Sequence, residues 1–126
     1  MTLLDSDVLI AHLRGVDAAG RCLTERRRRG PLHASIVSLA EITGGMHSHE
    51  RREVWRLLAG LRIEPVTERM GVRAGQLMRR FRRSHSSIAL GDYLIAATAI
   101  ELGLELATLN VRHFPMFEAL APAFDL

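Results

Sequence analysis

Apolar residues along this chain follow two patterns, short continuous runs and longer stretches with helical spacing. A continuous run is typical of a strand that is buried on both faces of a parallel sheet, whereas apolar positions three and four residues apart are typical of a helix. The runs predict strands at the start of the stretch 3–10, at 32–36, at 63–66 and at 104–109, with a short fifth strand in the tail, 123–126. The helical spacing predicts helices at 7–14, 17–29, 37–46, 48–61, 67–83 and 90–103.

Strands and helices alternate in this order, which is typical of an α/β fold with a parallel sheet and right-handed crossovers. In such a sheet, ligands bind beyond the carboxyl ends of the strands, at the point where the strand order reverses. The stretch 3–10 reads LLDSDVLI, so Asp5 and Asp7 stand at the end of the first strand. We therefore expect the other functional side chains to gather around Asp5.

Residues that can cap a first turn predict where the helices begin. Asp7 is expected to cap the first helix and Asp17 the second. Ser38 and Glu41 have the spacing of a capping box, which would give Glu41 a purely structural role. However, we expect this helix to begin nearer residue 36 or 37, and Glu41 would then be an inward-facing carboxylate among apolar positions. We favour this functional interpretation of Glu41.

Composition is that of an ordinary globular protein, with 48% hydrophobic and 25% charged residues in a chain of 126. One domain, residues 1–126, accounts for this length. Because no apolar run approaches the roughly 18 residues of a membrane span and no signal-peptide pattern is present, we expect a cytoplasmic protein without membrane contact. Cys22 is expected to be a small buried hydrophobe, and Trp55 a core residue or an interface anchor. The six histidines are expected at the surface.

Arginine supplies all 17 basic residues of the chain, and the net charge is +3. Guanidinium groups pair with phosphate oxygens through two hydrogen bonds, so clustered arginines indicate a nucleic-acid partner. A biased base composition of the genome would explain the absence of lysine but not the clustering. The most suggestive cluster consists of Arg79, Arg80, Arg82 and Arg83. Because these arginines end a predicted helix, a favourable interaction with the helix dipole is the alternative to RNA binding.

Oxygen-bearing side chains from four separate elements are predicted to meet at one edge of the sheet. Asp5 ends the first strand, and Glu41 lies in the helix after the second. Asp92 lies in the first turn of an almost wholly apolar helix, and Asn110 follows the fourth strand. An ionised carboxylate in such apolar surroundings needs a compensating partner. Carboxylates gathered without lysine or cysteine form a site that suits Mg²⁺ or Mn²⁺.

Four stretches of the chain resemble the successive signatures of PIN-domain ribonucleases, in particular the VapC toxins of bacterial toxin–antitoxin pairs. These stretches are LLDSDVLI, SLAEITGGM, GDYLIAATAIELGL and LATLNVRHF, in this order. The resemblance extends from Leu3 to Phe114. It implies a three-layer α/β/α sandwich with a short, mostly parallel sheet of four or five strands.

The resemblance also implies an activity, that of a Mg²⁺-dependent endoribonuclease toxin that cleaves structured RNA, such as tRNA or rRNA, with a metal-activated water. The family's catalytic residues carry over onto Asp5, Glu41, Asp92 and Asn110, and its metal ligands onto Asp5 and Asp92. Asparagine stands where an acid is common in the family, which disfavours a second tightly held ion. Ser6 and Thr108 match hydroxyl residues that support the site. A homodimer and a VapB-type antitoxin are implied as partners.

Two alternatives remain at this stage. LLDSDVLI also fits the opening motif of phosphatases of the haloacid-dehalogenase type, in which Asp5 would be the nucleophile and Asp7 the acid and base. That family normally holds the phosphoryl group with a lysine, which this chain lacks, and its later pair of acids is missing at Asp92. The second alternative is a non-catalytic module that binds RNA or a protein partner, with Asn110 as a sign of lost activity. Three intact acids argue against it.

Overall fold

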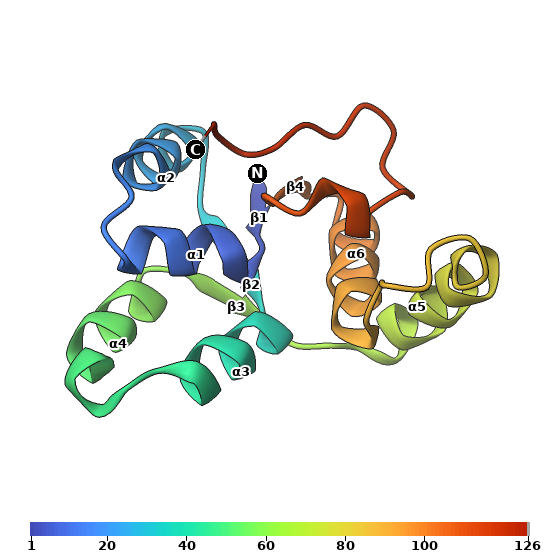
Figure 1. The fold of residues 1–126 in the computed structure, drawn as a ribbon, viewed down its shortest axis with the longest axis horizontal. Helices are drawn as coiled ribbons and strands as arrows, with labels where there is room; N and C mark the ends of the chain where they lie inside the picture. Colours follow the sequence, from blue (N-terminus) through green and yellow to red (C-terminus); the bar gives the residue numbers. More distant parts are fainter. Residues whose placement is uncertain (126) are drawn as a thin grey trace.

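The computed structural model describes residues 1–125, in which strands alternate with helices (Figure 1). The strands are β1 (Thr2–Leu4), β2 (Leu32–Ser35), β3 (Arg62–Glu64) and β4 (Glu105–Ala107). The α-helices are α1 (Ser6–Leu13), α2 (Asp17–Arg28), α3 (Ile36–Gly45), α4 (Arg51–Ala59), α5 (Glu68–Phe81) and α6 (Leu90–Leu102). Two short 3₁₀ turns are η1 (Ser48–Glu50) and η2 (Val111–His113).

Within residues 1–125 the strands form a single four-stranded sheet in the order β3-β2-β1-β4, and every neighbouring pair is parallel. β1 is an inner strand, because Leu3 pairs with His33 of β2 on one side and with Leu106 of β4 on the other. The chain moves outward from β1 to β2 and β3, then returns to place β4 on the opposite side of β1. The strand order thus reverses next to β1, and a crevice is expected beyond the ends of β1 and β4.

Helices cover both faces of the sheet (Figure 1). Helices α1 to α4 lie against one face, and α5 and α6 lie against the other. Successive side chains of a strand point to opposite faces, so Leu3 packs into the core under α5 and α6, whereas Leu4 packs into the core under α1 to α4. Both leucines are fully buried. These layers confirm the predicted α/β/α sandwich.

The tail does not form the fifth strand that its apolar residues predict. Residues 123–125 contain no strand, and Leu126 lies outside the described residues. The backbone N–H of Ala123 donates to the carbonyl of Thr108 at 2.9 Å, but one such bond is too little to form a ladder. The described sheet therefore has the smaller of the two predicted strand numbers.

The start of α2 differs from the prediction, whereas the start of α3 agrees with it. Val16 is the N-cap of α2, and Asp17 is already its first helical residue. In α3, which begins at Ile36 as expected, the hydroxyl of Ser35 accepts the N–H of Val37 at 3.0 Å. The alternative of a capping box between Ser38 and Glu41 is excluded, because β2 turns directly into α3 and Ser35, the last strand residue, caps the helix.

Three smaller predictions concern Cys22, Trp55 and membrane contact. Cys22 is buried, as predicted, and its Sγ lies 3.7 Å from the carbonyl oxygen of Ala123. Trp55 is 47% exposed, so it is not a core residue, and a role at an interface stays a prediction. Among the described residues, no helix combines the length and apolar character that a membrane crossing requires.

Candidate active site

Asp5 lies directly beyond β1, where the strand order reverses, and is only 6% exposed. Its Oδ1 accepts the backbone N–H of Ser6 at 2.8 Å, which makes Asp5 the N-cap of α1. Its Oδ2 accepts the hydroxyl of Thr108, one residue beyond β4, at 2.8 Å. The two hydrogen bonds hold the carboxylate between the ends of the two adjacent strands.

Asp7 was predicted to cap α1, and this prediction is wrong. Asp5 takes the cap position, and Asp7 in the first turn reaches across to the segment after β4. Its Oδ2 accepts the N–H of Leu109 at 3.0 Å and lies 3.3 Å from the hydroxyl of Thr108. Its Oδ1 is buried without a hydrogen-bond partner among the described residues. Asp7 therefore fixes the end of β4 against α1 and places a second carboxylate near Asp5.

Asp92 approaches the site from the first turn of α6. Its Oδ2 accepts the N–H of Ala89 at 3.1 Å and lies 3.1 Å from Nδ1 of His113. The side-chain amide of Asn110 lies 2.9 Å from the same ring nitrogen, because η2 turns His113 back over Asn110. Asp92 and Asn110 are thus brought together through His113.

Glu41 lies on α3 and is exposed, so the prediction that its side chain faces inward is wrong. Its Oε1 accepts the hydroxyl of Ser6 at 3.3 Å. Since Ser6 also donates its backbone N–H to Asp5, the two acids are linked through one residue rather than by a direct contact. Glu41 therefore stands at the solvent side of the site.

The electrostatic surroundings of Asp5 are unfavourable for its charge. Burial, together with repulsion from the carboxylates of Asp7 and Asp92, raises the pKa of Asp5 from 3.8 to about 7, although hydrogen bonds from Thr108 and Ser6 oppose the shift. Burial also raises the pKa of Asp7. Among the described residues, neither aspartate has an arginine or histidine within ion-pair distance.

A divalent cation fits this donor set. No three histidine, cysteine, aspartate or glutamate side chains within residues 1–125 are close enough to enclose a metal ion. Mg²⁺ does not require such a cage, because it usually keeps several waters and is bound through one or two carboxylates plus substrate phosphates. Asp5 and Asp92 offer two carboxylates, and the pKa of Asp5 is raised mainly by burial and by Asp7, with a smaller contribution from repulsion by Asp92. A cation between them would relieve that repulsion.

The arginine clusters differ in whether they have acidic partners. Arg26 and Arg29 pair with Glu105 at 3.2 and 3.8 Å. The four arginines predicted to bind RNA are exposed and make no ion pair within the described residues: Arg79, Arg80, Arg82 and Arg83. The guanidinium of Arg80 lies 5.0 Å from the ring centre of Phe81. Within residues 1–125, no acidic side chain therefore competes with phosphate for these four guanidinium groups.

Sequence reasoning missed His113, which it assigned to the surface with the other histidines. The ring is only partly exposed and joins Asp92 to Asn110. The available signal was its position three residues after Asn110, since that spacing brings two side chains together within one helical turn. His33 is a second exception, because it is buried and lies 2.8 Å from Glu64.

Comparison with known proteins gives consistent results at the level of sequence. The model of the PIN domain family matches residues 2–118. Ribonuclease VapC10 of Mycobacterium tuberculosis is 64% identical over 98% of this chain and 93% of its own length. Ribonuclease VapC19 of the same species is 39% identical over 98% of this chain and its full length.

Solved structures share the fold at lower sequence identity. VapBC2 from Rickettsia felis, solved bound to a DNA fragment from its promoter, matches with a TM-score of 0.83 and 20% identity over 96% of both chains. A toxin–antitoxin complex from Klebsiella pneumoniae matches with a TM-score of 0.80 and 22% identity over the full length of both chains. By sequence and by fold, the chain belongs to the PIN domain family, among the relatives of the VapC ribonucleases.

Proposed function

We propose that this protein is the endoribonuclease toxin of a type II toxin–antitoxin pair, which cleaves structured RNA such as tRNA or rRNA in the cytoplasm. The observation that carries the proposal is the state of Asp5, a buried carboxylate near two others and without a basic partner among the described residues. Such an arrangement is unfavourable for folding, and sites of this kind are typical of function. The ribonuclease names of the two sequence relatives support RNA as the substrate.

Asp5 and Asp92 are the proposed ligands of Mg²⁺, and Mn²⁺ would suit the same oxygen atoms. When bound, Mg²⁺ supplies a Lewis acid that polarises the scissile phosphate and lowers the pKa of a coordinated water. Asp5 is oriented for this role by Ser6 and Thr108, and Asp92 by the N–H of Ala89 and by His113. These hydrogen bonds fix the carboxylates before substrate arrives.

Glu41 is the proposed base that orients the attacking water and accepts its proton at a carboxylate oxygen. Its exposed position suits this task, because the water must enter from solvent, and the Ser6 hydroxyl holds its Oε1 toward Asp5. Attack by water leaves a 5′-phosphate and a 3′-hydroxyl, whereas attack by the ribose 2′-hydroxyl would leave a cyclic phosphate. Asn110 contributes a dipole and its contact with His113 rather than a charge.

A VapB-type antitoxin is the proposed partner, and a homodimer the proposed assembly. Solved neighbours of the same fold include VapBC complexes from Rickettsia felis and Salmonella typhimurium. We expect a small DNA-binding protein encoded directly upstream to co-purify with this chain and to suppress its cleavage of RNA. Light scattering of the separated toxin should give twice the mass of one chain, and a monomer that still cleaves RNA would remove the dimer from the proposal.

The phosphatase alternative loses its support, because the PIN domain match extends over residues 2–118 and the chain has no lysine. A non-catalytic module remains the competing function. Incubation of the purified protein with total RNA in Mg²⁺, in Mn²⁺ and in EDTA distinguishes a ribonuclease from a non-catalytic module. We expect discrete cuts with 5′-phosphate ends that disappear in EDTA, and sequencing of the ends would identify the RNA. Intact RNA under every metal condition, together with RNA binding, would favour the non-catalytic module.

A further inference from the structure

An open hollow of about 650 Å³ lies next to the acidic site. Loop residues 84–87 line one side, and residues 111–113 with Pro115 line the other. The lining carries the hydroxyls of three serines, two imidazoles and the guanidinium of Arg112, and it contains no carboxylate. This chemistry suits a phosphate, because hydroxyl and guanidinium groups donate hydrogen bonds to anionic oxygens.

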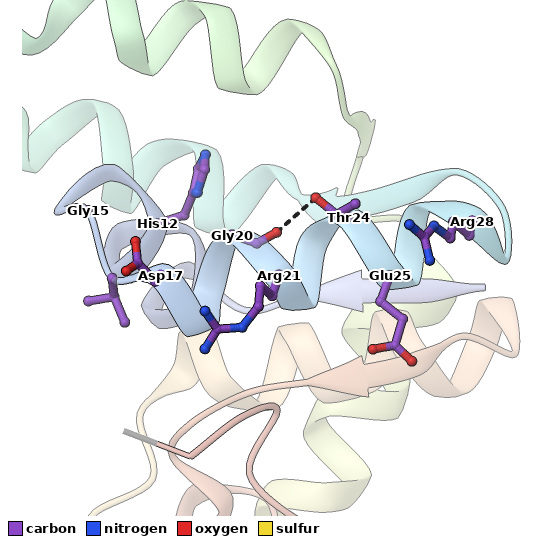
Figure 2. Close-up of a pocket in the computed structure, with 9 residues that line it drawn as sticks. His12, Gly15, Asp17, Gly20, Arg21, Thr24, Glu25 and Arg28 are labelled. Carbon is purple, nitrogen blue, oxygen red and sulfur yellow. Dashed lines mark hydrogen bonds between the residues drawn. The ribbon is translucent and has the colours of Figure 1, made fainter.

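A somewhat larger hollow along α2 shows the contrast (Figure 2). Asp17 and Glu25 lie around it together with Arg21 and Arg28, so charges of both signs line its wall. None of the proposed catalytic side chains belongs to that lining. Size alone therefore does not identify a substrate site, and the hollow at residues 84–87 differs by its uniform donor chemistry.

The loop that forms the first hollow is held at its base and open at its tip. The carbonyl of Phe81 accepts the N–H of His85 at 2.8 Å and the hydroxyl of Ser84 at 3.2 Å. The His85 ring packs edge-on against the Phe81 ring, with 5.8 Å between centroids. By contrast, Ser86 and Ser87 are exposed, and their hydroxyls make no hydrogen bond within the described residues. The tip thus presents two hydroxyl donors without a partner among residues 1–125.

The hollow connects the acidic site with the arginines of α5. At one end, His113 lines it and contacts Asp92. At the other end, Ser84 follows directly after Arg83, the last of the four arginines without ion pairs. Arg112, which precedes His113 in the chain, also lines the hollow, is exposed and makes no ion pair among the described residues. A path of donors therefore leads from the acidic site to the end of α5.

We propose that this hollow is a subsite for the phosphodiester backbone of the RNA nucleotide next to the cleaved bond, a proposal that rests on the proposed ribonuclease function. Arg112 binds the phosphate through its guanidinium, and the hydroxyls of Ser86 and Ser87 bind the remaining oxygens. The strand then continues toward the arginines at the end of α5. An open, donor-lined channel of this kind suits a passing strand, whereas an isolated small ligand is usually enclosed on most sides.

Binding is tested apart from cleavage in an Asp5→Asn background, with a short fluorescein-labelled single-stranded RNA of mixed sequence as the probe. Arg112→Gln should weaken binding about tenfold and lower the slope of log affinity against log salt by about 0.7, the value for one phosphate contact to a single strand. Ser86→Ala with Ser87→Ala should weaken binding without changing the slope. Arg21→Gln, an exposed arginine of the other hollow, is the matched control and should leave both quantities unchanged.

The same substitutions in the protein with Asp5 intact should raise KM for RNA cleavage and leave kcat within about twofold, since they alter binding rather than chemistry. If the parent cleaves RNA and Arg112→Gln retains parental affinity and salt slope, the subsite is wrong and the ribonuclease function stands. If Arg112→Gln weakens RNA binding but the parent cleaves no RNA in Mg²⁺ or Mn²⁺, the hollow binds RNA, but the ribonuclease function and the hollow's role beside a cleaved bond are both wrong. Circular dichroism of each variant checks that the fold is retained.

Discussion

Asp5 combines a structural and a chemical role in one side chain. It ends β1 and caps α1, so its backbone and one carboxylate oxygen are fixed by the fold itself. Its other oxygen is fixed by Thr108 at the end of the neighbouring strand. Both hydrogen bonds favour the ionised form of Asp5 and so lower its pKa. Burial and the neighbouring carboxylates raise the pKa by more than these hydrogen bonds lower it. The fold therefore fixes the position of the Asp5 carboxylate without placing a basic side chain beside it among the described residues.

Removal of one ligand charge should abolish activity without disrupting the fold. We expect Asp5→Asn and Asp92→Asn each to lower RNA cleavage by at least about a thousandfold, because a carbonyl oxygen binds Mg²⁺ far more weakly than a carboxylate. Asp17→Asn, on exposed α2, is the control and should cleave like the parent. Cleavage rates and circular dichroism spectra give the comparison, and parental activity of Asp92→Asn at saturating Mg²⁺ would contradict the assignment.

Asn110→Asp tests the position at which the site lacks a fourth acid. The new carboxylate should lower the Mg²⁺ concentration needed for half-maximal cleavage, and it should lower the Tm of the metal-free protein through repulsion from Asp92. Because His113 lies between the two side chains, the parent and the variant are compared at the same pH. Calorimetry with and without Mg²⁺ reports both effects. Unchanged metal affinity together with unchanged stability would place residue 110 outside the reach of the ion.

At the scale of elements, helix α5 ends in a cluster of arginines whose position has two explanations. Cations are favoured at a helix C-terminus, and exposed guanidinium groups also bind phosphate. Replacement of Arg79, Arg80, Arg82 and Arg83 by glutamine should weaken RNA binding and flatten its salt dependence by roughly 0.7 for each phosphate that is no longer bound.

Arg26→Gln with Arg29→Gln is the control for that experiment, because these arginines pair with Glu105 rather than facing solvent alone. Anisotropy titrations over a range of salt concentrations measure both variants. If the α5 variant keeps the parental slope while its Tm falls, the helix dipole is the better explanation.

Apolar spacing predicted the helices and strands well, because each helix buries one face against the sheet and the inner strands are buried on both faces. The apolar run at residues 3–10 correctly predicted β1 and α1, and the alanine-rich stretch at residues 90–103 correctly predicted α6. Helix starts were predicted less well, since the cap is chosen by which side chain reaches a free N–H in three dimensions. Asp5, the last residue before α1, takes this role from Asp7.

The acids at strand ends could be predicted from the sequence, because parallel strands end at one edge. The contacts that orient them could not. The hydroxyl of Thr108 reaches Asp5 and Asp7 only after β4 has paired with β1, and His113 reaches Asp92 only after η2 has turned. The exposed position of Glu41 likewise depends on the direction of α3 and not on its local apolar neighbours.

For the whole molecule, the raised pKa of Asp5 makes the stability of the metal-free protein depend on pH. The folded state keeps a proton on Asp5 up to about pH 7, whereas the unfolded chain releases it near pH 4. Folding is therefore favoured at low pH relative to high pH, and this contribution is lost as pH rises from about 4 to 7, by on the order of a few kcal/mol. We expect the Tm in EDTA to be lower at pH 8 than at pH 5.5.

Asp5→Asn should remove most of this pH dependence, because an amide does not titrate in that range. Mg²⁺ should raise the Tm of the parent more at pH 8 than at pH 5.5, since the ion binds the ionised carboxylate. The Tm of the parent and of Asp5→Asn is measured at pH 5.5 and at pH 8 by thermal unfolding followed by circular dichroism. The parent is also measured with Mg²⁺ at both pH values. An equal slope of Tm against pH in the parent and in Asp5→Asn would show that another group is responsible.

The placement of β1 between β2 and β4 also governs when the protein becomes active during its own synthesis. Asp5 is among the first residues made, but Thr108, which orients it, is made 103 residues later. At translation rates of about 5–20 residues per second, this interval lasts on the order of ten seconds. Until β4 has left the ribosome and paired with β1, the acids belong to an unfinished sheet. The acidic site that we propose for RNA cleavage is therefore incomplete throughout synthesis and forms only with the completed fold.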